Sequence, residues 1–190
     1  MVGLIAKPQH ITTQSFRSAG NALLLIGLPG DELGASHYLK IIHGRKEGAP
    51  PLLDYDREIA VQQAVLALIR MGLVCSAHDC SEGGLAVALA ESAMSGTAPI
   101  GADVDLGTQG LRADQVLFNE SQSRIILSIQ TANLSAALSY LQENQVPARQ
   151  IGHTISAPVL RITAEKKSWE WPLAMLRTAW ADSIERIMAE

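Results

Sequence analysis

The chain has few cysteines, few aromatic residues and no run of positive charge. Aromatic residues make up 4% of its 190 residues, and the net charge is −4. Nucleic-acid binding usually shows as basic tracts interleaved with aromatic residues, so this function has no support here. No apolar run reaches the length of a membrane span, and no signal peptide is visible. With 47% hydrophobic residues, the composition predicts a folded, cytoplasmic protein with no nucleic-acid or membrane partner.

The two cysteines, Cys75 and Cys80, are separated by four residues. This is not CxxC spacing, and no second Cys or His pair completes a zinc site. We expect both to be reduced thiols. Cys75 lies in a predicted strand, which favours packing in the core over a catalytic role.

The order of apolar runs predicts an α/β (α+β) sandwich, in which a mixed β-sheet is packed with helices. The length suits one domain of ordinary size. Apolar runs and alternating patterns place strands at 2–6, 22–28, 74–77, 100–106, 123–130, 151–155 and 159–163. Helical spacing and capping residues place helices at 33–42, 54–71, 83–94, 111–118, 133–144 and 172–188.

Two of these helices carry an apolar stripe. In the helix capped by Asp54, the residues expected to face the core are Ile59, Val65, Leu66 and Ile69. In the C-terminal helix, the stripe consists of Leu173, Leu176, Trp180, Ile184 and Ile187. We interpret the second stripe as core or as an interface with a partner domain. Trp169 and Trp171, which precede it, are not favoured as ligand-stacking residues.

The segment from Val74 to Glu91 predicts a strand, a polar loop and a helix. Glycine lets the backbone turn sharply and lets a ligand approach it closely, and a helix N-terminus attracts anions. We therefore predict that Ser81, Glu82, Gly83 and Gly84 bind a phosphate or nucleotide. On this hypothesis, Gly84→Val blocks the ligand with only a modest loss of stability. The alternative is that the glycines only make the turn and Ser81 only caps the helix.

A second polar cluster, Asn119–Arg124, precedes a predicted strand. Its carboxylate, amide, hydroxyl and guanidinium groups can hold a polar ligand, or they can form a satisfied network that pins the loop. His78, beside Asp79, can serve as acid or base, although a structural hydrogen bond is the favoured interpretation. We assign no catalytic residue.

Several strings of the sequence resemble phosphoribosylformylglycinamidine synthase, the synthetase component of purine biosynthesis. They occur in the same order as in that family, between residues 1 and about 160, and correspond to its C-terminal region. The strings are Met1–Ile5, Ser36–Leu39, Leu73–Glu91, which contains His-Asp-Cys-Ser-Glu-Gly-Gly, and Leu117–Arg124. The resemblance implies a fold like the C-terminal domain of aminoimidazole ribonucleotide synthetase.

The resemblance also implies an activity. The full-length enzyme is an ATP-dependent carbon–nitrogen ligase that converts formylglycinamide ribonucleotide (FGAR) to formylglycinamidine ribonucleotide with glutamine-derived ammonia. ATP and magnesium are its expected cofactors. Residues 1–190 would be a single C-terminal-type domain, a fragment of a larger multidomain synthetase that is inactive alone. Expected partners are the N-terminal-type domains of the same enzyme, a glutaminase subunit, a small accessory subunit and a second copy of this chain.

The family has two such C-terminal-type domains, and this chain resembles the second. In the first copy, residues matching Glu120, Ser121 and Gln122 contact the substrate, and one matching Asp79 binds magnesium. We place Arg124 with this ligand wall. Residues 81–84 depart from the first copy's Gly-Ala-Ala-Gly loop, which favours an auxiliary nucleotide site or a structural role.

Two other functions remain as alternatives. One is a docking domain with a vestigial site. The other is a different synthetase of the same superfamily, such as selenophosphate synthetase or a hydrogenase-maturation protein. The Ser-Glu-Gly-Gly and Glu-Ser-Gln-Ser-Arg strings together argue against the second alternative.

Overall fold

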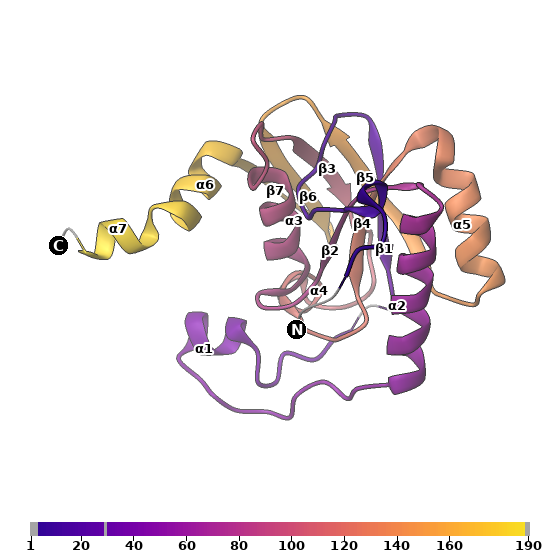
Figure 1. Ribbon diagram of the computed structural model, residues 1–190. Helices are drawn as coiled ribbons and strands as arrows, with labels where there is room; N and C mark the ends of the chain where they lie inside the picture. Colours follow the sequence, from indigo (N-terminus) through magenta and orange to yellow (C-terminus); the bar gives the residue numbers. More distant parts are fainter. Residues whose placement is uncertain (1–3, 29, 189–190) are drawn as a thin grey trace.

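A seven-stranded sheet forms the centre of the molecule in the computed structural model, which describes residues 4–28 and 30–188 (Figure 1). Its strands, in chain order, are β1 (Asn21–Ile26), β2 (Val74–Asp79), β3 (Gly101–Asp105), β4 (Ile125–Gln130), β5 (Ala148–Ile155), β6 (Val159–Ala164) and β7 (Lys167–Pro172). Across the sheet the order is β2-β4-β1-β5-β3-β6-β7. The β3–β6 pair is parallel and the other pairs are antiparallel, which confirms the predicted mixed sheet.

Helices cover both faces of the sheet. The helices of the described residues are α1 (His37–His43), α2 (Tyr55–Arg70), α3 (Gly84–Met94), α4 (Ala113–Phe118), α5 (Leu134–Glu143), α6 (Leu173–Ala181) and α7 (Ser183–Met188), with short 3₁₀ helices η1 (Pro8–His10) and η2 (Thr131–Asn133). α2 and α5 pack on one face, while α3, α4 and the start of α6 pack on the other. No helix among the described residues is both long and apolar enough to cross a bilayer.

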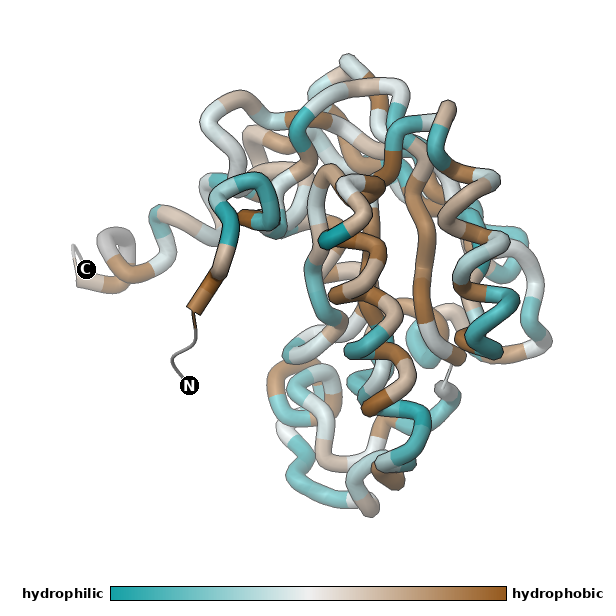
Figure 2. The backbone as a smooth tube through the Cα atoms, turned by 45° about the vertical axis from the view of Figure 1, so that its right-hand side comes forward, coloured by the Kyte–Doolittle hydropathy of each residue, from teal (hydrophilic) through white to brown (hydrophobic). Residues whose placement is uncertain are grey.

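The alternation of side chains along β1 explains this layered arrangement. All six of its residues are buried. Leu23 and Leu25 point to the α3 and α4 side, whereas Leu24 and Ile26 point to the α2 and α5 side, because successive strand residues face opposite ways. Figure 2 shows apolar stretches gathered in the middle of the body.

The predicted first strand, residues 2–6, is not confirmed. Residues 2 and 3 lie outside the described part of the chain, and residues 4–6 are irregular. The predicted helix at 33–42 begins later, at His37, because residues 34 and 35 form a turn and Ser36 caps the helix through its hydroxyl. α1 buries none of its residues and stands apart from the sheet (Figure 1).

The sequence analysis missed β7. This strand pairs with β6 across a tight turn at Glu165 and Lys166, whose φ angles are 50° and 63°. Turns with positive φ usually carry glycine or asparagine, so no turn residue indicated this hairpin. The side chains of Trp169 and Trp171 therefore lie on one face of an edge strand.

The predicted C-terminal helix divides into α6 and α7 at Asp182. Of its apolar stripe, Leu173 is buried, but Trp180 is 54% exposed and Ile184 74% exposed. The end of the stripe is therefore not part of the core of this chain. Figure 1 shows α6 and α7 extending away from the sheet.

The N-cap of α2 is confirmed, since the Asp54 carboxylate accepts a hydrogen bond from the Arg57 amide at 3.1 Å. The predicted buried face was only partly right. The residues that face the sheet are Val61, Ala64, Val65 and Leu68. Ile59 and Leu66 are 53% and 45% exposed. The reason is that the buried face of α2 is rotated by about one residue from the face that we predicted.

Two leucines of α2 give a direct test of this orientation. Leu68→Ala removes a fully buried side chain, so we expect it to lower the free energy of unfolding by about 2–5 kcal/mol. Leu66→Ala, two residues away and 45% exposed, should cost less than about 1 kcal/mol. Urea unfolding of both variants measures the difference. Equal losses would contradict the orientation of α2.

Candidate functional site

The two predicted polar segments meet at one end of the sheet. β2 runs antiparallel to β4, and Asp79 pairs with Ile125, so the end of one strand lies beside the start of the other. The Cys80 amide extends this pairing by donating to the Arg124 carbonyl at 2.9 Å. A hollow of about 380 Å³ opens here. Its lining residues are Leu53, Glu58, Asp79, Cys80, Ser81, Glu120, Gln122, Ser123, Arg124 and Ile125.

This hollow contains five of the predicted site residues: Asp79, Ser81, Glu120, Gln122 and Arg124. The other four do not line it. Glu82, Gly83 and Gly84 lie at the start of α3. Ser121 lines a neighbouring hollow of about 220 Å³, which it shares with Gln122. The sequence analysis did not name Glu58 at all, and it included Ser123 only as a member of the polar cluster Asn119–Arg124. Their side chains hydrogen-bond to each other.

Glu120 joins three distant parts of the chain. Its Oε1 accepts hydrogen bonds from the backbone amides of Gly83 at 2.8 Å and His37 at 2.9 Å. Gly83 is the N-cap of α3 and His37 is the first residue of α1. A carboxylate is stabilised at a helix N-terminus by the unpaired N–H groups and the helix dipole. The imidazole of His37 also lies near this carboxylate, with Nδ1 3.6 Å from Oε2.

The α3 N-terminus is where the sequence predicts an external phosphate. The Gly83 amide donates to the Glu120 carboxylate, and the Gly84 amide donates to the Ser81 carbonyl at 3.0 Å. A carboxylate of this chain thus occupies the position at which we expected a ligand anion. The ligand roles of residues 81–84 stay predictions.

Gly84 is required by packing. It has a φ of +66°, and a Cβ atom there would lie 2.5 Å from the Asn119 carbonyl oxygen and 3.0 Å from that of Leu117. Such distances force the backbone to shift. The expectation that Gly84→Val would cost only modest stability was therefore wrong, because α3 meets the end of α4 at this glycine.

Arg124 is turned toward its own loop. Its side chain is almost fully buried, and its Nη1 donates to Asn119 Oδ1 at 2.6 Å and to the Asn119 carbonyl at 3.3 Å. Burial lowers its pKa from the usual arginine value. Arg124 contributes to the wall of the hollow while it pins the Asn119–Arg124 loop.

His78 bonds across to α3. Its Nε2 lies 2.8 Å from Glu91 Oε2, and its Nδ1 lies 3.5 Å from Asp79 Oδ1. The structural hydrogen bond that we favoured is present. The described residues contain no group of three side chains that could hold a metal ion on their own. Asp79, which is 69% exposed, can offer one carboxylate to a magnesium ion, which usually keeps waters and phosphate oxygens as its other ligands.

Neither cysteine is paired. Burial raises the pKa of the Cys80 thiol to about 11, although the nearby Arg124 opposes this shift. The Cys80 thiol is therefore protonated at neutral pH and is a poor nucleophile.

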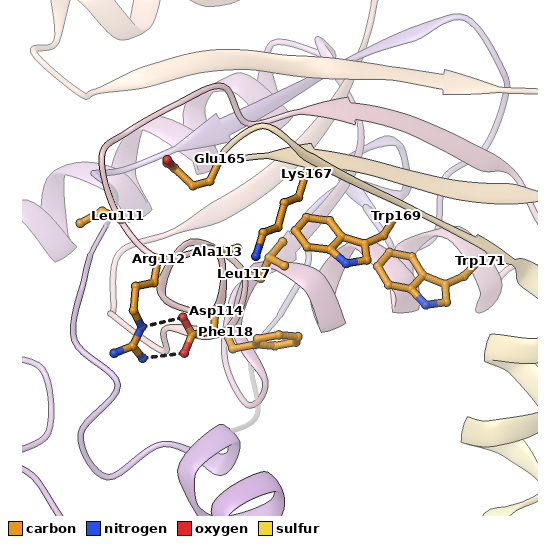
Figure 3. Close-up of a pocket in the computed structure, with 10 residues that line it drawn as sticks. All are labelled: Leu111, Arg112, Ala113, Asp114, Leu117, Phe118, Glu165, Lys167, Trp169 and Trp171. Carbon is orange, nitrogen blue, oxygen red and sulfur yellow. Dashed lines mark hydrogen bonds and ion pairs between the residues drawn. The ribbon is translucent and has the colours of Figure 1, made fainter.

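A larger hollow of about 640 Å³ lies elsewhere, between α4 and β7 (Figure 3). Lys167, Trp169 and Trp171 form one wall, and α4 forms the other. Arg112 donates two hydrogen bonds to the Asp114 carboxylate, at 3.0 and 2.6 Å, which lowers the pKa of Asp114. The sequence analysis missed this hollow because it missed β7.

The mixed sheet with helices on both faces defines an α/β domain that has a polar hollow at one end of the sheet. The family described as AIR synthase related protein, C-terminal domain, matches residues 18–165. The chain belongs to this family.

Relatives and solved structures agree with this assignment. Phosphoribosylformylglycinamidine synthase subunit PurL from Moorella thermoacetica is 42% identical over 193 residues, which cover 100% of this chain and 25% of the relative. The same subunit from Caldanaerobacter subterraneus subsp. tengcongensis is 37% identical over 185 residues, which cover 97% and 25%. "T. maritima PurL complexed with FGAR" shares the fold, with a TM-score of 0.75 at 22% identity over 89% of this chain and 30% of that one.

These comparisons confirm the synthase resemblance and the predicted fold. The chain spans about a quarter of the length of the curated relatives it matches. The names of these relatives therefore describe proteins of which about three quarters lie outside the match.

Substitutions at two glycines can separate two causes of lost stability, an unfavourable backbone conformation and a steric clash. Gly72 and Gly84 have φ angles of 72° and 66°, but a Cβ at Gly72 meets no atom within 4 Å. We expect Gly72→Ala to lower the free energy of unfolding by about 1 kcal/mol. Gly84→Ala should cost at least about 2 kcal/mol more, because the backbone must shift. Thermal unfolding compares them, and equal costs would contradict the tight contact between α3 and α4.

Proposed function

We propose that this chain is the C-terminal-type domain of a phosphoribosylformylglycinamidine synthase. As in the resemblance described above, the complete enzyme would use ATP and glutamine-derived ammonia to convert FGAR to formylglycinamidine ribonucleotide in purine biosynthesis. Residues 1–190 would be one domain of this multidomain ligase and inactive alone. The observation that carries the proposal is the convergence of two of the synthase-like strings, Leu73–Glu91 and Leu117–Arg124, on one hollow, where Glu120 joins them.

Relatives support the reaction. Two proteins that match nearly all of this chain bear the name of the synthase subunit. T. maritima PurL, which shares the fold, has been solved with ATP, ADP, AMPPCP and FGAR. These ligands are the first to test on this chain.

Within the hollow, we assign a role to each polar group. The Glu120 carboxylate would accept hydrogen bonds from the ligand, Gln122 would offer its amide, and Ser81 its hydroxyl. Ser121 and Arg124 would support this wall, while Glu82, Gly83 and Gly84 would shape the loop beside it. Asp79 would hold magnesium together with phosphate oxygens of the ligand.

The charges around the hollow support the proposal that magnesium accompanies the ligand. Three lining residues, Glu58, Asp79 and Glu120, carry carboxylates, and the one lining cation, Arg124, is buried against Asn119. A phosphate entering alone would meet repulsion, since like charges at close range disfavour each other. A bound magnesium ion reverses the sign of the local potential.

We further propose that the domain works in the cytoplasm beside the N-terminal-type domains, a glutaminase subunit and a small accessory subunit. The name of one structural relative, "Structure of PurLQS from Thermotoga maritima", places PurL in a larger assembly. The exposed apolar side chains of Trp180, Ile184 and Ile187 would be covered by such a partner.

The ligand proposal predicts a thermal shift. FGAR, ATP or ADP with magnesium should raise the melting temperature by about 5–10 °C at a hundredfold excess over Kd, since binding to the native state stabilises it by mass action. EDTA should abolish the shift. Glu120→Gln should reduce the shift strongly, whereas Glu143→Gln, on an exposed residue of α5, should leave it unchanged.

A hybrid enzyme extends the test to the complete reaction. In this hybrid, the chain replaces the matching quarter of the Moorella relative, and ATP-dependent amidination of FGAR is measured with ammonium as nitrogen donor. Activity that falls with Glu120→Gln but persists with Glu143→Gln supports the proposal. A hybrid that is folded but inactive, together with no thermal shift by any of the three ligands, would favour a docking domain with a vestigial site.

The apolar surface of α6 and α7 predicts self-association of the chain when it is purified alone. Sedimentation equilibrium should show a dimer at micromolar concentration, because contact between two copies would remove this surface from water. Replacing Ile184 with lysine should shift the equilibrium to monomer. A monomer at every concentration would contradict the second copy as a partner.

A further inference from the structure

Asn119 lies next to Glu120 and has no exposed surface. Its side-chain amide makes four hydrogen bonds. The Nδ2 group donates to the carbonyls of Gly30 at 2.9 Å and Gln115 at 2.6 Å, and Oδ1 accepts from Arg124 Nη1 at 2.6 Å and from the Ser121 amide at 3.4 Å.

These contacts use the full capacity of the amide, which has two N–H donors and an oxygen with two acceptor sites. The two donors face carbonyl oxygens and the acceptor faces N–H groups, so the partners fix its orientation. An aspartate of the same shape cannot donate to the two carbonyls. A leucine of similar volume makes none of the four bonds.

The partners of Asn119 belong to the excursion between β1 and α2, to α4 and to the loop that carries Glu120. Gly30 lies in the excursion between β1 and α2, which carries His37. Arg124 closes the loop that carries Glu120 and immediately precedes β4. Because one amide holds both segments, it sets the position of the Glu120 carboxylate relative to the His37 amide.

The backbone of Asn119 also packs against α3, beside the hydrogen bond from the Gly83 amide to Glu120. Its carbonyl oxygen is the atom that a Cβ at Gly84 would approach to 2.5 Å. The loop therefore lies directly against the start of α3, where the Gly83 amide donates to Glu120.

We propose that Asn119 is a positioning residue for the ligand wall. It holds Glu120 and Gln122 at the hollow by fixing the loop to the β1–α2 excursion and to β4, and it does not touch ligand itself. This inference rests on the proposed function for the identity of the ligand. The positioning can be measured without ligand.

The test is hydrogen exchange of the full chain, followed at the amides of His37 and Gly83. Asn119→Asp removes the two donated hydrogen bonds and keeps the acceptor. Exchange at both amides should rise about tenfold, because their hydrogen bonds to Glu120 open more often. Leu141→Ala serves as the matched control, since it removes a buried side chain of α5 on the opposite face of the sheet and leaves the loop intact.

Unchanged exchange at His37 and Gly83 in the aspartate variant overturns the proposal. An equal rise in Leu141→Ala also overturns it, because the effect would then be global. If Asn119→Asp does not fold, Arg124→Lys takes its place. This substitution keeps the positive charge but removes the guanidinium group. A rise in exchange at His37 and Gly83 then supports the proposal, and unchanged exchange overturns it.

Kinetics in the hybrid enzyme give a second readout. Asn119→Asp should raise the KM for FGAR by about tenfold, while Leu141→Ala leaves the KM of the folded enzyme unchanged. Equal KM values in an active hybrid argue against positioning. A folded hybrid that is inactive before any substitution, together with no thermal shift by any of the three ligands, contradicts the proposed function, and the exchange measurement then decides the role of Asn119 by itself.

Discussion

The site depends on one carboxylate, that of Glu120, which accepts hydrogen bonds from the amides of Gly83 and His37. These two amides are 46 positions apart in the sequence and belong to the starts of two helices. Helix N-termini attract negative charge, so the carboxylate satisfies donors that would otherwise need a ligand or water. It also ties the start of α1 to the loop before β4, although α1 buries none of its own residues.

Packing around Glu120 fixes the position of its carboxylate. Gly84 lets the backbone of α3 meet the backbone at the end of α4, and the Asn119 side chain ties the following loop to its neighbours. The chemistry of the hollow follows from this arrangement. Carboxylates line the hollow, and the arginine in its wall bonds to Asn119. On the proposed function, a phosphate-bearing ligand would therefore enter together with magnesium.

Local patterns predicted much of the fold. The apolar run of β1, the Asp54 cap of α2 and the strand–loop–helix around residues 74–94 depend on neighbouring residues, and the structure has all three. β7 was missed because its turn, at Glu165 and Lys166, has no glycine or asparagine. The bond between Glu120 and His37 spans 83 residues, and no local pattern encodes a contact between two segments so far apart. For the same reason, the sequence analysis did not predict that the Gly83 amide donates to the Glu120 carboxylate.

The measurement that most directly tests whether the hollow around Glu120 is the ligand site is an NMR titration of the ¹⁵N-labelled chain with FGAR and magnesium. Our account predicts that the amide signals of His37, Gly83 and Gln122 shift together at one concentration of ligand. It predicts that the indole signals of Trp169 and Trp171, in the other hollow, do not move. Shifts confined to the two indoles would contradict the account and would place the ligand between α4 and β7.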